Sequence, residues 1–260
     1  MELVLQWGLD CIRSIQWYAN PPLTVFMRLI TGLGSSYAYM VLLPLLYWCI
    51  DEKKSLRLGM AVLISAWLNV MLKLALNQPR PFFPGYDPSL GLIAEKMGGF
   101  PSGHAQNSLV LWIIIASWGK KKWHFALAGF LCLFIAFSRV YLGVHFPTDI
   151  VGGWFVGGIV LCGYFLAGKK IEETLAAYTP RAGMIASAAL AFFMILYRPV
   201  VDMLMPGGLL LGLGIGYVLC KRRIGFNAAV LNENAVIKYL MLLARFVIGM
   251  AGLVLLYIVT

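Results

Sequence analysis

Long apolar runs, separated by short turns that contain charged residues or prolines, follow one another along most of this chain. A run of about 20 apolar residues is long enough to cross the hydrocarbon core of a bilayer as a helix. The sequence is 61% hydrophobic and only 12% charged, which is far from the balance of a soluble domain. It therefore predicts an all-α, polytopic bundle of transmembrane helices surrounded by membrane lipids.

Eight runs qualify as candidate spans. They cover residues 23–50, 56–76, 102–118, 125–141, 147–167, 183–197, 207–220 and 237–258. The sixth and seventh runs are shorter, and two prolines, Pro199 and Pro206, lie between them. A six-helix core with a re-entrant pair is therefore an alternative to eight full spans.

The chain divides into three regions on this pattern. Residues 1–18 place apolar side chains at roughly helical spacing, so residues 1–22 are expected to form an amphipathic helix in the membrane interface. Residues 23–170 form the membrane core, and residues 171–260 add further transmembrane helices that complete or extend the bundle. Glycine-rich faces in the last region are suited to helix packing, and an oligomer or partner contact through these helices is compatible with them.

Basic residues gather in alternate turns between the candidate spans. One set of turns holds Lys53, Lys54, Arg57, Lys120, Lys121, Lys122, Lys169, Lys170, Arg181, Lys221, Arg222, Arg223 and Lys238. The positive-inside rule predicts that these turns are cytoplasmic, so the turns that contain Arg80, Lys96 and Arg198 face the other side. The net charge of +10 then reflects topology, and no nucleic acid partner is expected.

Three short segments at the predicted outer face combine charged and polar residues. In chain order they are Lys73 to Arg80-Pro81, then Pro101-Ser102-Gly103-His104, then Ser138-Arg139 with His145 and Asp149. Each cation or histidine, taken singly, is more often a surface or structural group, but their convergence at one face favours a binding site. The loop between the first two segments, residues 77–100, is rich in proline and glycine and is typical of a lid or substrate mouth.

An anion such as phosphate fits these segments. Ser102 and Gly103 stand at the start of a candidate span, where unpaired backbone N–H groups and the helix dipole attract negative charge. Lys73, Arg80 and Arg139 supply three cations that would neutralise the oxygens of a phosphoryl group. The sequence therefore predicts a phosphate-binding site that these five residues form together.

Two histidines and an aspartate supply candidate catalytic groups. Asp149 would hold the His145 imidazole in one tautomer and leave its far nitrogen free to attack phosphorus. His104 would protonate the leaving oxygen and later accept a proton from the attacking water. His104 and His145 lack the spacing of metal ligands, and three nearby cations would repel a metal, so no metal and no cofactor are expected.

Written as patterns, the three segments are K-x6-R-P, P-S-G-H and S-R-x5-H-x3-D, and in this order they resemble the type 2 phosphatidic acid phosphatase family in full. The resemblance implies a six-helix core and metal-independent hydrolysis through a phosphohistidine at His145, at the outer membrane face. It also implies His104 as the acid, and phosphate bound by Lys73, Arg80, Ser102, Gly103 and Arg139. Soluble vanadium haloperoxidases look similar at these motifs, so the motifs alone indicate an anion site rather than one reaction.

The resemblance leaves the substrate open. Members of the family act on phosphatidic acid, phosphatidylglycerol phosphate, undecaprenyl pyrophosphate, lipid A phosphates, sphingoid phosphates and, in one branch, glucose 6-phosphate. The expected partner of this chain is a lipid phosphate, and the alternatives are a water-soluble sugar phosphate or transport of a phosphate-bearing lipid without hydrolysis. The expected location is a bacterial inner membrane, with the site facing the periplasm or the exterior.

Overall fold

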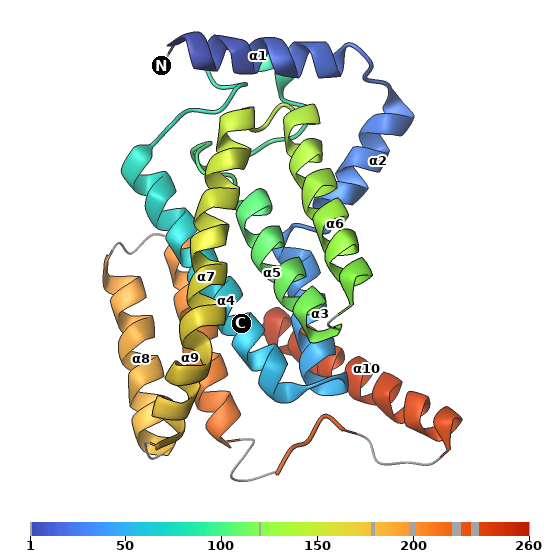
Figure 1. Ribbon diagram of the computed structural model, residues 1–260, viewed down its shortest axis with the longest axis vertical. Coiled ribbons are helices and arrows are strands. Elements are labelled where there is room, and N and C mark those ends of the chain that lie inside the picture. The colour runs from blue at the N-terminus through green and yellow to red at the C-terminus, as the bar shows by residue number, and fades with distance from the viewer. Residues whose placement is uncertain are drawn as a thin grey trace.

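The computed structural model describes residues 2–119, 121–177, 180–197, 201–219, 225–229 and 234–259 (Figure 1). Its elements are α1 (Glu2–Gln16), α2 (Pro21–Gly32), α3 (Ser36–Cys49), α4 (Glu52–Leu76), the 3-10 helix η1 (Pro88–Leu90), α5 (Gly103–Gly119), α6 (Lys122–Tyr141), α7 (Pro147–Ala177), α8 (Pro180–Tyr197), α9 (Val201–Leu219) and α10 (Ala235–Val259). No strand occurs in these ranges. The predicted all-α membrane fold is confirmed.

Among the described residues, four helices have the length and apolar composition of a membrane span: α4, α6, residues Pro147–Gly168 of α7 and residues Ala235–Leu255 of α10. Helices α2 and α3 would form a fifth span, but they are bent by 47° relative to each other. The expected single span over residues 23–50 is thus two helices. The break has a local cause, because the Ser35 side chain accepts a hydrogen bond from Ala38 N and caps a new helix.

Helix α1 lies across the ends of α6 and α7 rather than along the bundle (Figure 1). Its inner side is buried, and Ile12 is fully covered by the core beneath it. Gly8 allows close approach, since an added Cβ there would lie 2.8 Å from Phe146 Cδ1. Gln16 Nε2 donates to Leu90 O and to Tyr141 O, both at 2.8 Å. The amphipathic N-terminal segment therefore covers the turn that follows α6.

Helix α5 is the centre of the bundle and packs against α4, α6 and α7. The contact between α5 and α7 is especially close because α7 presents glycines to it. A Cβ on Gly153 would lie 2.6 Å from Ser102 O, and one on Gly157 would lie 2.9 Å from Gln106 O. Gly153 and Gly157 therefore let α7 pack closely against α5.

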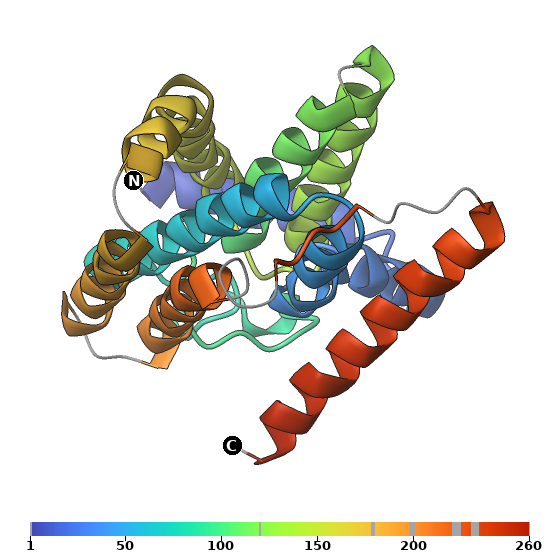
Figure 2. The same ribbon diagram turned by 90° about the horizontal axis from the view of Figure 1, so that it is seen from below.

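The C-terminal helices contact the core through α4 and α3. Helix α7 runs on to Ala177, past residue 170, and the expected division of the chain at that residue stays a prediction. Helices α8 and α9 pack on each other, and a Cβ on Gly207 would lie 2.8 Å from the Ile195 side chain. Helix α10 contacts α3 and extends along the edge of the molecule (Figure 2).

Candidate active site

The ends of four helices and one long loop bring the predicted site residues together. Lys73 comes from the end of α4, Arg139 from the end of α6, and Asp149 from the first turn of α7. The ends of α6 and α7 lie beneath α1, and α4 also ends in the half of the bundle nearer to α1 (Figure 1). The buried site residues are Lys73, Arg80, Ser102, Arg139, His145 and Asp149. Burying so many polar groups is unfavourable unless they pair with one another or with a ligand.

The loop after α4 brings Arg80 back towards Lys73. Asn77 adopts the left-handed backbone conformation, with φ of 43°, and its N–H donates to Lys73 O at 2.9 Å, which ends α4. The prolines that follow prevent the helix from continuing. Lys73 Nζ donates to Gly98 O at 2.5 Å and to Gly99 O at 3.1 Å, so it also fixes the far end of the same loop. The chain therefore bends between the two cations.

His145 is held by Asp149 in one orientation. Its Nδ1 lies 3.0 Å from Asp149 Oδ2, and the same carboxylate oxygen accepts the Phe146 N–H at 3.0 Å. The tight turn before His145 uses Gly143, whose φ of 69° suits glycine. With Nδ1 donating to the carboxylate, Nε2 carries the free lone pair. That nitrogen lies 3.2 Å from Arg80 Nη1, which can donate to it.

The electrostatic environment keeps His145 neutral. Burial lowers the pKa of His145 well below its ordinary value of 6.5, and the positive charges of Arg80 and Arg139 lower it further. Burial also lowers the pKa of Arg80, to about 10, so this guanidinium remains charged at neutral pH. A neutral imidazole beside a charged guanidinium is the form in which histidine acts as a nucleophile.

The start of α5 contributes fewer backbone donors than expected. Ser102 N donates to Asp149 O at 2.9 Å, so this N–H is already used within the protein. The Ser102 hydroxyl accepts the Ala105 N–H at 3.5 Å and caps the helix. Ser102 could therefore contact an anion only through its hydroxyl hydrogen, while the Gly103 N–H has no acceptor among the described residues. Gly103 itself is required by Asn69, whose Oδ1 would lie 2.9 Å from an added Cβ.

His104 stands in the first turn of α5 and faces the break between α2 and α3. A Cβ on Gly34 would lie 3.2 Å from His104 Cδ2. Within the part of the chain that the structure describes, no side chain or backbone group forms a hydrogen bond with the imidazole of His104. The ring is thus free to exchange a proton with a bound ligand.

Several residues of the site were missed by sequence reasoning. Gln78 Nε2 donates to Asp149 Oδ1 at 3.1 Å, and Thr31 Oγ1 accepts from Arg139 Nη1 at 2.9 Å. Glu95, in the loop, forms ion pairs with both Arg80 and Arg139. The only sequence signal for Glu95 is that it is one of two acidic residues in a loop that lies between cationic motifs.

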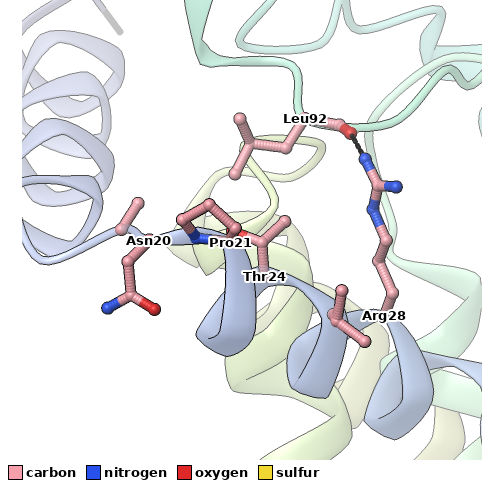
Figure 3. Close-up of a pocket in the computed structure, with 7 residues that line it drawn as sticks. Asn20, Pro21, Thr24, Arg28 and Leu92 are labelled. Atoms are coloured by element: carbon pink, nitrogen blue, oxygen red, sulfur yellow. Dashed lines mark hydrogen bonds between the residues drawn. The ribbon is translucent and has the colours of Figure 1, made fainter.

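An open pocket of about 390 Å³ lies at the start of α2 (Figure 3). Its lining residues are Ala19, Asn20, Pro21, Thr24, Val25, Arg28 and Leu92. Arg28 Nη2 donates to Leu92 O at 2.7 Å and so ties α2 to the outer loop (Figure 3). None of the predicted catalytic residues lines this pocket.

Comparison with known sequences finds relatives that are named as phosphatases. Residues 54–173 match the family model of the PAP2 superfamily. Phosphatidylglycerophosphatase B of Bacillus subtilis is 33% identical over 117 residues, which are 42% of this chain and 53% of that protein. The chain spans about half the length of the first curated relatives that it matches.

Two solved structures share the arrangement of the helices. The first transmembrane PAP2 type phosphatidylglycerolphosphate phosphatase from Bacillus subtilis matches with a TM-score of 0.57 and 26% identity, over 69% of this chain and 90% of that chain. LpxE of Aquifex aeolicus matches with a TM-score of 0.53 and 30% identity, over 60% of this chain and 92% of that chain. The matched part is therefore nearly the whole of each of those two proteins.

Proposed function

Because this chain belongs to the PAP2 superfamily, we propose that it is a membrane phosphatase that hydrolyses a phosphomonoester or diphosphate on a lipid. One observation carries the proposal. His145 is buried, its Nδ1 is bound to Asp149, and its Nε2 faces the guanidinium of Arg80. A phosphoryl group that binds Arg80 would therefore lie next to the lone pair of His145.

The first step of the proposed reaction forms a covalent intermediate. His145 Nε2 attacks phosphorus, and the bond between phosphorus and the lipid oxygen breaks. His104 gives its proton to that oxygen, so the lipid leaves as an alcohol, or as a lipid monophosphate where the substrate is a diphosphate. Asp149 stabilises the positive charge that develops on the His145 ring.

The second step releases phosphate. Water attacks the phosphohistidine, His104 accepts a proton from that water, and the bond between phosphorus and Nε2 breaks. Lys73, Arg80 and Arg139 neutralise the charge on the oxygens of the transferred group in both steps. The Ser102 hydroxyl and the Gly103 N–H are the proposed donors from the start of α5. No step requires a metal ion.

The distribution of charge supports an extracytoplasmic site. Lys53 and Lys54 lie at the start of α4, and Lys121 and Lys122 lie at the start of α6. These positions are at the end of the bundle opposite to Lys73 and Arg139, which lie in the last turns of the same two helices. Cytoplasmic loops carry the excess of basic residues, so the site would face the periplasm or the exterior.

The test is release of inorganic phosphate from a panel of lipid phosphates in detergent with excess chelator. We expect release by the native protein and none above background by His145→Ala. His124→Ala is the matched control, because His124 lies at the start of α6, at the opposite end of the bundle, and should retain activity. Radiolabelled substrate should leave an acid-labile label on the native protein that is absent from His145→Ala.

The alternatives predict other results. Release only from glucose 6-phosphate or similar soluble esters would replace the lipid by a sugar phosphate as the substrate. Movement of a labelled lipid phosphate between the leaflets of a vesicle without release of phosphate would indicate transport. Full activity in His145→Ala would contradict the proposed nucleophile.

A further inference from the structure

Glu95 already occupies the arginine pair of the proposed phosphate site. Its Oε2 lies 3.6 Å from Arg80 Nη2, and its Oε1 forms an ion pair with Arg139 Nη2. One carboxylate thus bridges two guanidinium groups that are 3% and 2% exposed, while its own side chain is 28% exposed. The arginines are held in the interior, and the acid reaches them from the mouth of the site.

This carboxylate does not use all the donors of the pair. Arg139 Nε is buried and has no acceptor among the residues that the structure describes. Glu95 meets each arginine through a single oxygen, although a guanidinium can donate two parallel bonds to a suitable anion. A phosphate group has more oxygens and could engage Arg139 through both Nε and Nη2. The site is therefore better matched to phosphate than to the residue that fills it.

The backbone that carries Glu95 is anchored a few residues away. Leu92 N donates to Leu142 O at 3.0 Å, and Leu92 O accepts from Arg28 Nη2 at 2.7 Å. Lys73 holds Gly98 on the other side of Glu95. These bonds fix both ends of a short segment, and the side chain of Glu95 between them is partly exposed. Rotation of that side chain would vacate the arginine pair without opening the whole loop.

We infer that Glu95 is an internal counter-anion which the phosphate of the substrate replaces, and that it sets a charge threshold for what can bind. Glu95 brings one negative charge to Arg80 and Arg139. A phosphodiester also brings one charge, so it gains little by displacing Glu95. A phosphomonoester or terminal diphosphate carries nearly two charges at neutral pH, so it gains electrostatic energy when it replaces the carboxylate.

The consequence is that the lipids of the bulk membrane leave the arginine pair to Glu95. Ordinary bilayer phospholipids are phosphodiesters and greatly outnumber lipids with a terminal phosphate. A permanent competitor on the arginines raises the dissociation constant of every anion by the same factor. Weakly binding diesters are then kept out at their membrane concentration, while terminal phosphates still bind. This role rests on the proposed function, because it assumes that the arginine pair binds the phosphate of a lipid substrate. The competition itself can be tested by measuring binding alone.

The experiment compares native protein with Glu95→Gln in detergent micelles, using calorimetric titration with inorganic phosphate at pH 8. If Glu95 is seated in about nine of ten molecules, its neutralisation should tighten phosphate binding by about tenfold. Dihexanoyl phosphatidylglycerol, a soluble diester, should bind measurably to Glu95→Gln and not to the native protein. Asp87→Asn is the matched control, because Asp87 is the other acid of the loop and pairs with Arg13 instead. It should leave both affinities unchanged.

A second variant, Glu95→Asp, keeps the test informative if Glu95→Gln does not fold. Glu95→Asp keeps the charge but shortens the side chain, so it should bridge the two arginines less well and give an intermediate phosphate affinity. Unchanged or weaker phosphate binding in both variants would overturn the inference, because Glu95 would then support the site rather than compete for it. These titrations measure binding and need no turnover. If no lipid in the activity panel releases phosphate, the proposed function is refuted, but the competition between Glu95 and phosphate can still be tested.

Discussion

Gln78 Nε2 lies 3.1 Å from Asp149 Oδ1, while the other oxygen of that carboxylate receives His145 Nδ1 and the Phe146 N–H. The two oxygens of Asp149 are therefore held from different sides. Gln78 belongs to the loop after α4, whereas His145 belongs to the turn before α7. The amide of Gln78 thus links the first cationic segment to the proposed nucleophile, and it acts on the reaction only through Asp149.

We expect Gln78→Ala to lower kcat by about tenfold and to change KM little, because a hydrogen bond to a charged group contributes about 1.5–3 kcal/mol. Steady-state kinetics on the best lipid phosphate would measure both constants. Gln6→Ala is the control, since within the described ranges the Gln6 side chain bonds only to the exposed Asp10 on α1. A larger rise in KM than fall in kcat would assign Gln78 to substrate binding instead.

His104 can be tested through the leaving group. If it protonates the departing oxygen, His104→Gln should reduce turnover of an alkyl phosphate by about 10²–10⁴-fold. A phosphate ester of a nitrophenol needs no proton to leave, so its turnover in the first step should fall much less. Rapid-mixing measurement of nitrophenolate release would compare native protein with His104→Gln. Equal losses on both esters would remove His104 from the role of acid.

The pKa of His145 predicts how the free protein responds to acid. Its ordinary value is 6.5, and burial together with Arg80 lowers the pKa well below this. At pH 6.5, where an unperturbed histidine would be half protonated, His145 should remain neutral and able to attack. The chain has three histidines, so nuclear magnetic resonance of labelled imidazoles can be assigned by single substitutions. A His145 signal that titrates at or above pH 6.5 would contradict the described electrostatics.

Two neighbouring glycines of α7 allow a test of the helix packing behind the site. A Cβ on Gly157 would lie 2.9 Å from Gln106 O, whereas nothing lies within 4 Å of a Cβ on Gly158. Gly157→Ala should therefore reduce stability by about 1–3 kcal/mol, as overpacking does. Gly158→Ala should leave stability unchanged or slightly raised, because alanine favours helix. Thermal unfolding in detergent would compare them, and equal melting temperatures would show that α5 and α7 are not this close.

Sequence reasoning recovered the elements whose physical signal is local. The site residues of α4, α6 and α7 were predicted because apolar runs end near Lys73 and Arg139 and begin again before Asp149. The bend between α2 and α3 was missed, although Gly34 and Ser35 interrupt that apolar run and Ser35 caps the second helix. Apolar content alone predicts one long helix there, because it gives no information on helix-capping residues such as Ser35.

The rest of the site depends on tertiary contacts that no periodicity encodes. Glu95 and Gln78 lie in a loop whose conformation is fixed by distant groups, including Leu142 O and the ammonium of Lys73. The backbone N–H of Ser102 was expected to face an anion, but α7 approaches so closely that Asp149 O accepts it. Such pairings become visible only when the helix ends are placed in space.

Four groups of the proposed site belong to four different helix ends: Lys73 to α4, Gly103 to α5, Arg139 to α6 and Asp149 to α7. A helix that tilts to match a thinner or thicker bilayer moves its end relative to the other three. The distances between these four groups are therefore coupled to the thickness of the surrounding membrane. Acyl chain length, far from the phosphate chemistry, becomes a variable that controls how well this site is assembled.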